Sequence, residues 1–282
     1  MAIETGIKWT DSTSNPWWGC TKVEGAPACL DCYAEDVDKR GTAKDQPLHW
    51  GHGAARRRVS EKARNEPYRW QKNADKFFAE HGRAQRVFTL SMGDLLDNEV
   101  DRQWRSDHMG VMEDCDRLEW QICTKRISNL PKMIWPRWEE AWPQHIGVLI
   151  TVVTQKEADR DIPRLLGMKR RFGIPWVGVS YEPAQEYVNF EDYLSGSRNF
   201  NSHGEDITPS IARLAKLDWI IFGGKSGSRW NDGPFDIQWA VDVNNLCSAY
   251  GVPFFMKQVA AFRPTDAMIP ADLMVRQWPK GH

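Results

Sequence analysis

The sequence predicts an α/β fold: a complete or partial (β/α) barrel of the TIM type, with a cysteine-bearing loop near its N-terminus. Short apolar segments rich in β-branched and aromatic residues recur along the chain, and amphipathic stretches separate most of them. Nearly continuous apolar strands that alternate with helices are typical of a parallel sheet with right-handed crossovers. Most of these segments also end in small or hydrogen-bonding residues, as strands do where a β/α fold carries its site.

Seven predicted strands and the helices between them give the order of elements. The strands are expected at residues 6–13, 86–92, 118–124, 146–153, 176–181, 218–224 and 252–258. The clearest helices are expected at 98–114, 155–172 and 235–250, after a polar, helix-leaning region at 33–82. The segment 183–210 interrupts the alternation, and we expect an inserted loop at the mouth of the site. A doubly wound open sheet is the alternative fold. Because no linker or repeat divides the chain, we expect one domain over 1–282.

Composition and charge exclude some classes of protein. The 282 residues are 41% hydrophobic and 27% charged, as in soluble globular proteins, and no apolar run reaches the roughly 20 residues that span a bilayer. The N-terminal residues lack the pattern of a signal peptide, so we expect a cytoplasmic protein with reduced thiols. The net charge is −1, but the basic runs 54–64 and 169–172 could contact phosphates or be solvated helix faces. Five tryptophans in polar surroundings could stack on a flat ligand: Trp17, Trp18, Trp50, Trp70 and Trp230.

The ends of the predicted strands are polar. In parallel β/α folds these ends gather at one edge of the sheet, where ligands bind. They lie at 91–94, 124–126, 151–155, 180–183, 223–227 and 257–258. Glycine pairs such as 223–224 expose backbone N–H groups that suit an anionic ligand, although tight turns use glycine as well. The set of ends predicts a site for a substantial polar ligand.

Cys20, Cys29 and Cys32 form the other candidate site, in a loop with the spacing C-x8-C-x2-C. A structural zinc would need a fourth ligand, which His49 or His52 could supply. A [4Fe–4S] cluster held by three thiolates would instead leave one iron open for a cofactor or substrate. The third alternative is three reduced cysteines without a metal. The spacing alone does not choose among them, and the scattered Cys115, Cys123 and Cys247 are expected to be packing residues.

The motifs around the cysteines make the sequence similar to the radical S-adenosylmethionine (SAM) superfamily, and more narrowly to a phage-associated, radical-SAM-like family. Sequences of that family open with Trp, Asp, Asn-Pro and Gly-Cys, followed by C-x-x-C-Tyr-Ala, which are found here at Trp9, Asp11, 15–16, 19–20 and 29–34. The resemblance continues through "SMGDLLDNEV" (91–100), "CTKR" (123–126), "GVSYEP" (178–183), "LDWIIFGGKSG" (217–227), "GVPFFMKQ" (251–258) and "VRQWP" (275–279). It covers nearly the full length of the chain.

This resemblance implies a barrel of the radical SAM type, in which Cys20, Cys29 and Cys32 hold a [4Fe–4S] cluster. SAM would chelate the open iron, and an electron from a flavodoxin- or ferredoxin-type donor would cleave it to methionine and a 5′-deoxyadenosyl radical that abstracts a substrate hydrogen. The phage association implies a substrate in DNA or among nucleotides, in the host cytoplasm if the chain is phage-encoded. The concrete expectation is an isomerase that rearranges an amino-acid-decorated thymidine in phage DNA. A free metabolite or a peptide would fit nearly as well.

Residues at the strand ends receive expected roles through the same resemblance. Those expected at the cluster or SAM are Tyr33, Ser91, Gly93, Asp94, Thr151, Gln155, Ser180, Glu182, Gly223 and Gly224. Those expected to bind an anionic substrate are Lys125, Arg126, Lys225 and Lys257, because cations pair with phosphates and carboxylates. The plainer alternatives are a helix cap for Asp94, core packing for Tyr33 and solvated side chains for the lysines.

The sequence departs from the related families at three places. The commonest radical-SAM loop is C-x3-C-x2-C, with an aromatic residue just before the third cysteine, whereas here the first gap is longer and Tyr33 follows Cys32. Lys225 replaces a glutamate, and Val153-Thr154 replaces Glu-Asn. Two other functions remain open. One is a zinc-stabilised, non-catalytic nucleic-acid-binding protein whose arginine run 56–58 contacts DNA; the other is a degenerate barrel that binds SAM without cleaving it.

Overall fold

The computed structural model describes residues 5–30, 32–42, 46–208 and 215–279. The chain divides into two compact units, 1–147 and 148–282, and the boundary falls inside strand β6 (Ile146–Thr151). The strand order is β1-β4-β5-β6-β7-β8-β9. No helix among the described residues is both long and apolar enough to cross a membrane.

The first unit is built on parallel strands in the order β1-β4-β5. These are β1 (Ser12–Ser14), β4 (Gln85–Thr89) and β5 (Leu118–Thr124). Val87 of β4 pairs in register with Trp120 of β5, and both side chains are fully buried. A two-stranded antiparallel ribbon joins β2 (Trp17–Trp18) to β3 (Arg57–Arg58).

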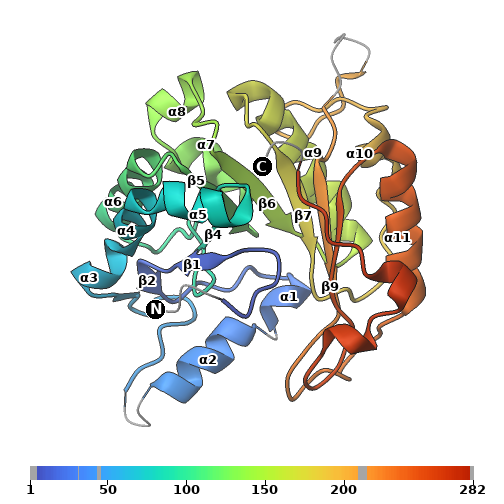
Figure 1. Cartoon of the computed structure of the whole chain (residues 1–282), viewed down its shortest axis with the longest axis horizontal. Helices are drawn as coiled ribbons and strands as arrows, with labels where there is room; N and C mark the ends of the chain where they lie inside the picture. The colour runs from blue at the N-terminus through green and yellow to red at the C-terminus, as the bar shows by residue number, and fades with distance from the viewer. Residues whose placement is uncertain (1–4, 31, 43–45, 209–214, 280–282) are drawn as a thin grey trace. The chain divides into compact units, whose positions relative to one another are not determined.

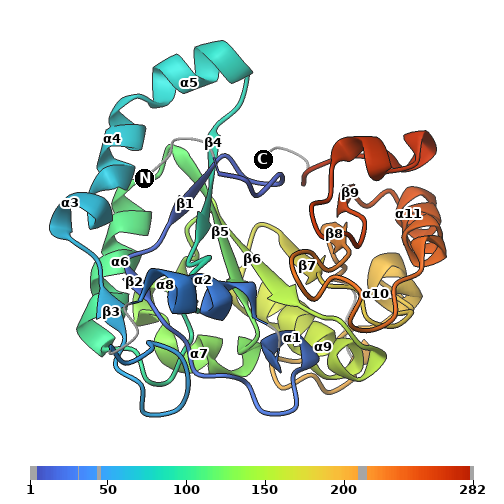
Figure 2. The same ribbon diagram turned by 90° about the horizontal axis from the view of Figure 1, so that it is seen from below.

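Short helices surround these strands. They are α1 (Pro27–Leu30), α2 (Tyr33–Gly41), α3 (Glu61–Arg64), α4 (Glu66–Lys72), α5 (Ala74–His81), α6 (Arg102–Asp114), α7 (Leu130–Met133) and α8 (Pro136–Glu140). Figure 2 shows α3 and α4 beside α6, and the Tyr68 hydroxyl of α4 donates to Asp114 of α6 at 2.8 Å. The carboxylate of Asp101 accepts from the N–H of Gln103 at the start of α6, which satisfies a donor that the helix itself leaves free.

The second unit continues the alternation of strands and helices. Its parallel strands follow the order β6-β7-β8-β9, with β7 at Val177–Tyr181, β8 at Trp219–Gly223 and β9 at Phe254–Gln258. Its helices are α9 (Gln155–Phe172), α10 (Glu191–Ser195) and α11 (Ile237–Tyr250). Helices α10 and α11 lie together on one side of the strands (Figure 1).

Most sequence-based expectations of strands and helices are confirmed. β5 and α9 have the predicted bounds, whereas β1 begins at Ser12, near the end of the predicted 6–13. A doubly wound sheet reverses its strand order part-way, and neither unit contains such a reversal. The fold is therefore mixed α/β and compatible with a partial (β/α) barrel.

The predicted inserted loop is a packed segment in the residues that the structure describes, 183–208; residues 209–210 lie outside them. It contains α10, and Phe190 and Leu194 are fully buried. The segment also lies directly on α9, since a Cβ at Gly167 would fall 1.8 Å from the carbonyl oxygen of Asn201. The predicted insertion is therefore a packed segment, which apolar burial fixes against α9.

Candidate functional site

The chain leaves β1 through a segment that is tied to the end of β4. The side-chain oxygen of Asn15 accepts from the backbone N–H of Met92 at 2.8 Å, and the N–H of Gly19 donates to the Met92 carbonyl at 3.0 Å. Gly19 has φ +112°, and a Cβ there would lie 2.2 Å from the carbonyl oxygen of His49, so the position requires glycine. These contacts place Cys20 beside the carboxyl end of β4.

The three predicted ligand cysteines are free thiols. Cys29 is buried in α1, while Cys20 and Cys32 are half-buried. Cys20 and Cys32 pack against one small apolar cluster formed by Ala34, Trp50 and Met92. Cys32 occupies the N-cap position of α2, but its side chain caps no N–H. The fold thus brings two of the three thiols to the same cluster.

Arg126, which follows β5, contacts the first cysteine directly. Its Nη1 donates to the Cys20 sulfur at 3.4 Å and forms an ion pair with Asp94 Oδ2 at 2.9 Å. Its Nη2 donates to the carbonyl of Thr21. The guanidinium therefore joins the cysteine loop to the segment after β4.

Lys125 lies near the other thiols. Burial alone would lower the pKa of its ammonium, but the electrostatic influence of Cys29, Cys123, Cys32 and Asp94 raises it above the usual value. An opposite charge acts in this way only at short range in a poorly solvated site. The structure thus places Lys125 and Arg126, the two predicted substrate-binding cations that follow β5, beside the cysteines. Cys123, which the sequence suggested was a packing residue, is among the neighbours of Lys125.

The carboxylate of Asp94 is fully used by neighbouring groups. It accepts from the backbone N–H of Leu96 at 2.9 Å, the hydroxyl of Thr124 at 2.9 Å and the N–H of Lys125 at 3.2 Å, besides its ion pair with Arg126. It does not cap a helix, because Asp101 holds that position for α6. Asp94 therefore links the ends of β4 and β5.

Burial makes Cys20 a weak acid. The pKa of the Cys20 thiol is raised to about 12, chiefly by burial. Asp94 and Asp97 act in the same direction, and Arg126 acts in the opposite direction. An ordinary cysteine has a pKa of about 8.5. Because the pKa of Cys20 is higher still, its thiol is protonated at neutral pH when no metal is bound.

A buried ion pair between Arg56 and Asp97 fixes the backbone next to Cys20. Arg56 Nε donates to Asp97 Oδ2 at 3.0 Å, and the N–H of Thr21 donates to the same oxygen at 3.1 Å. The guanidinium also donates to the carbonyls of His49, Gly51 and Ala54 at 3.3, 3.3 and 2.6 Å. One cation therefore organises three loop segments.

The two histidines considered for zinc differ in their surroundings. His49 Nδ1 lies 2.9 Å from the buried carboxylate of Asp38, and the N–H of Gly51 donates to the Cys20 carbonyl at 2.9 Å. His52 is highly exposed and pairs with Glu99. Over the described ranges, no three histidine, cysteine, aspartate or glutamate side chains are close enough to hold a metal ion. The residue types suit zinc or an iron–sulfur cluster.

Tyr33, Ser91 and Gly93 join the cysteine segment to the end of β4. The Tyr33 hydroxyl donates to the carbonyl of Ser91 at 2.8 Å, and the Ser91 hydroxyl pairs with the amide of Asn15. A Cβ at Gly93 would lie 3.2 Å from the carbonyl of Gly19. Tyr33 is exposed, so the core-packing alternative for it is wrong.

The other predicted site residues belong to the second unit. Glu182 accepts from the hydroxyl of Ser180 at 3.0 Å and forms an ion pair with Lys257 at 2.7 Å. A Cβ at Gly223 would lie 2.6 Å from Glu182 Oε1, so glycine makes room for this carboxylate. The four residues form one polar cluster at the ends of β7, β8 and β9.

The remaining predicted residues of this unit make local contacts. Gln155 accepts from the N–H of Asn189 at 2.8 Å and donates to Asp159 at 2.8 Å. Lys225 donates to the carbonyl of Asp232 at 3.2 Å. Gly224 exchanges hydrogen bonds with the backbone and side chain of Gln258, and Thr151 is buried at the end of β6.

Sequence reasoning missed the structural use of several polar and aromatic residues. Arg56 was considered as a phosphate contact, and nothing local in the sequence indicated its pairing with Asp97. Three of the tryptophans proposed to stack on a ligand are core residues: Trp17, Trp50 and Trp70. Trp18 is half-buried beneath Arg57, whose guanidinium lies 4.2 Å from its ring centroid, and Trp230 is exposed.

One protein family matches the chain over residues 4–279, and its description is "Protein of unknown function (DUF5131)". The chain belongs to this family. Searches among curated proteins and among solved structures find no match. The family description assigns no chemistry, so the geometry of the cysteine loop carries the functional argument.

Proposed function

We propose that this protein is a radical SAM enzyme in which Cys20, Cys29 and Cys32 bind a [4Fe–4S] cluster. When bound, the cluster would supply an electron to SAM and yield a 5′-deoxyadenosyl radical that abstracts a hydrogen from the substrate. One observation carries the proposal: the loop holds three free thiols, two of them on one apolar cluster, with Lys125 and Arg126 beside them.

The surrounding residues have roles that suit this proposal. A group held by three thiolates carries excess negative charge, which the cations of Lys125 and Arg126 would offset at short range. Asp94 holds the Arg126 guanidinium in place, and the Arg56–Asp97 pair holds Thr21 next to Cys20. Cys20 and Cys32 pack against the apolar cluster of Ala34, Trp50 and Met92.

The polar strand ends are proposed to bind SAM and the substrate. In the first unit the proposed residues are Tyr33, Ser91 and Gly93, with Asp94 acting through the Arg126 guanidinium that it holds. In the second unit they are Thr151, Gln155, the Ser180–Glu182–Lys257 cluster with Gly223, and Gly224 with Lys225. We propose a modified, amino-acid-decorated thymidine of phage DNA as the substrate, isomerised by hydrogen abstraction, with a reduced flavodoxin or ferredoxin as electron donor. This finer proposal rests on the sequence resemblance, and nucleoside analysis of modified DNA before and after reaction tests it.

The zinc alternative has one observation in its favour. A carboxylate on Nδ1 of a histidine commonly orients Nε2 toward a metal, and Asp38 contacts His49 in this way, close to Cys20. The nucleic-acid surface that this alternative requires is weaker. Arg56 and Arg58 are ion-paired to Asp97 and Asp107, so their charges are already balanced within the chain.

Anaerobic purification with iron, sulfide and zinc analysis tests the proposal. We expect about four irons per chain and absorbance near 400 nm, both lost in Cys29→Ala and retained in the matched control Cys247→Ala, which removes a buried cysteine of α11. Reduction in the presence of SAM should then produce 5′-deoxyadenosine. A colourless protein that holds only zinc after reconstitution would refute the cluster, and a loaded protein that forms no 5′-deoxyadenosine would be a non-cleaving scaffold.

A further inference from the structure

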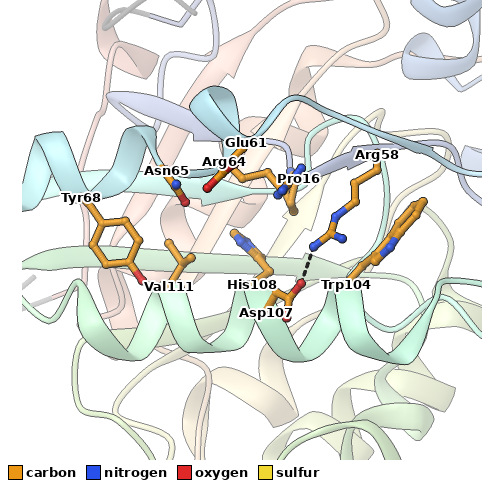
Figure 3. A pocket seen from close by; sticks show the side chains of 10 residues that line it. All are labelled: Pro16, Arg58, Glu61, Arg64, Asn65, Tyr68, Trp104, Asp107, His108 and Val111. Atoms are coloured by element: carbon orange, nitrogen blue, oxygen red, sulfur yellow. Dashed lines mark hydrogen bonds and ion pairs between the residues drawn. The ribbon is translucent and has the colours of Figure 1, made fainter.

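A second candidate site lies in the first unit, away from the cysteines. It is a pocket of about 270 Å³ between the α3–α4 segment and helix α6. Figure 3 shows side chains of α6 pointing toward those of α3 and α4 across the pocket. None of the six cysteines lines it, and neither the cluster nor SAM is needed to explain it.

The floor of the pocket contains a buried, uncharged histidine. His108 is only 2% exposed, and its Nε2 bonds to the hydroxyl of Thr89 in β4. Within the described part of the chain its Nδ1 has no hydrogen-bond partner, and the ring lies among the residues that line the pocket (Figure 3). Burial lowers the pKa of His108 to about 3, so it is neutral at physiological pH. The imidazole can therefore offer its Nδ1 to a ligand in the pocket.

Four charged side chains line the pocket. Two of them form an ion pair with each other, and the other two form no ion pair among the described residues. Arg58 and Asp107 form an ion pair with each other (Figure 3). The carboxylate of Glu61 has no partner among the described residues. Among the described residues, the guanidinium of Arg64 donates to the carbonyl of Val59 alone, at 2.5 Å. The pocket therefore presents one negative and one positive group that are both available.

Apolar surfaces complete the lining. Pro16, Trp104 and Val111 line the pocket, and the volume is close to the lower end of the range for small-molecule sites. A complementary ligand carries a cation, an anion and an apolar body in a small volume.

We propose that this pocket binds a free α-amino acid with an apolar or aromatic side chain. The ligand carboxylate pairs with Arg64, its ammonium pairs with Glu61, and its side chain packs on Pro16, Trp104 and Val111. The Nδ1 of His108 completes the polar contacts. The proposal is independent of the radical SAM assignment.

Isothermal titration of the full-length protein with L-phenylalanine and L-leucine tests this proposal. We expect saturable binding of at least one of them, and weakening of about 10-fold or more in both Arg64→Gln and Glu61→Gln, because each removes a charge-assisted contact. Arg69→Gln is the matched control, since Arg69 belongs to the neighbouring α4, pairs with Glu66 and does not line the pocket; its affinity should match the wild type.

Two truncated ligands separate the contributions of the charges. Phenylpropionate lacks the ammonium and phenethylamine lacks the carboxylate, so each should bind about 10-fold more weakly than phenylalanine. Equal binding of either compound would overturn the zwitterion assignment. Absence of binding by every amino acid tested, or unchanged affinity in Arg64→Gln with an unchanged melting temperature, would overturn the site.

Discussion

Removing the Arg56 guanidinium should destabilise the protein and loosen the backbone at Cys20. Its side chain is 2% exposed and that of Asp97 is fully buried, so Arg56→Met leaves an uncompensated carboxylate in the interior. Breaking a buried pair by removing one partner costs about 3–5 kcal/mol. The three carbonyls that accept from Arg56 also lose their donor, which places the expected value toward the upper end of that range.

Urea denaturation followed by tryptophan fluorescence measures this loss. With a slope of about 2–3 kcal/mol per molar urea, the midpoint should fall by about 1–2.5 M. Arg56→Lys should fall less far, because it keeps the charge but not the planar fork that reaches several acceptors. The control Arg117→Met removes an exposed ion pair with Asp75 and should leave the midpoint close to that of the wild type.

Alkylation of Cys20 gives a local readout of the same change. Thr21 is held by Asp97 and by Arg56, and the neighbouring Cys20 thiol has a raised pKa, so it should react slowly in the wild type and faster in Arg56→Met. Peptide mass spectrometry after iodoacetamide treatment follows this rate. If Arg56→Met changed neither the midpoint nor the Cys20 rate beyond the Arg117→Met control, the pair would not organise the loop and the reasoning would be wrong.

Two further predictions concern Gly19, next to Cys20, and His108, which lines the pocket. Gly19→Ala should lower stability by about 1–3 kcal/mol and expose Cys20 to alkylation, because φ is +112° and the new Cβ would meet the His49 carbonyl. At Gly25 φ is also positive, +71°, but a Cβ would meet no atom within 4 Å. A melting temperature of Gly19→Ala equal to that of Gly25→Ala would therefore contradict the steric part of this prediction. For His108, the folded-state pKa is about 3 and the unfolded value is about 6.5. The unfolded chain therefore takes up a proton first as the pH falls, so this group's contribution to stability is complete above about pH 6.5 and decreases by up to about 1.4 kcal/mol per pH unit toward pH 3. Urea midpoints at about pH 7 and about pH 5 should differ less in His108→Gln than in the wild type, and equal differences would refute the assignment.

The sequence alone determined the features that depend on neighbouring residues. The apolar run at 118–124 predicted the bounds of β5, and the periodic stretch at 155–172 predicted the bounds of α9. Thr154 caps the start of α9, and Gly173 ends the helix with a left-handed backbone. Local signals suffice there because strand alternation, helix periodicity and capping act within a few residues. The three-cysteine loop was also visible in the sequence, because its spacing is itself the signal.

Only the tertiary structure decided what the polar residues do. The arginine run at 56–58 looks uniform in sequence, yet Arg56 is buried against Asp97, Arg57 stacks on Trp18 and Arg58 pairs with Asp107. The sequence predicted that Asp94 binds SAM. Its carboxylate instead accepts from Thr124 and Lys125 and forms an ion pair with Arg126. These partners are distant in the chain, and a buried charge takes whichever partner the fold brings to it, since leaving it alone costs several kcal/mol. No local pattern carries that information.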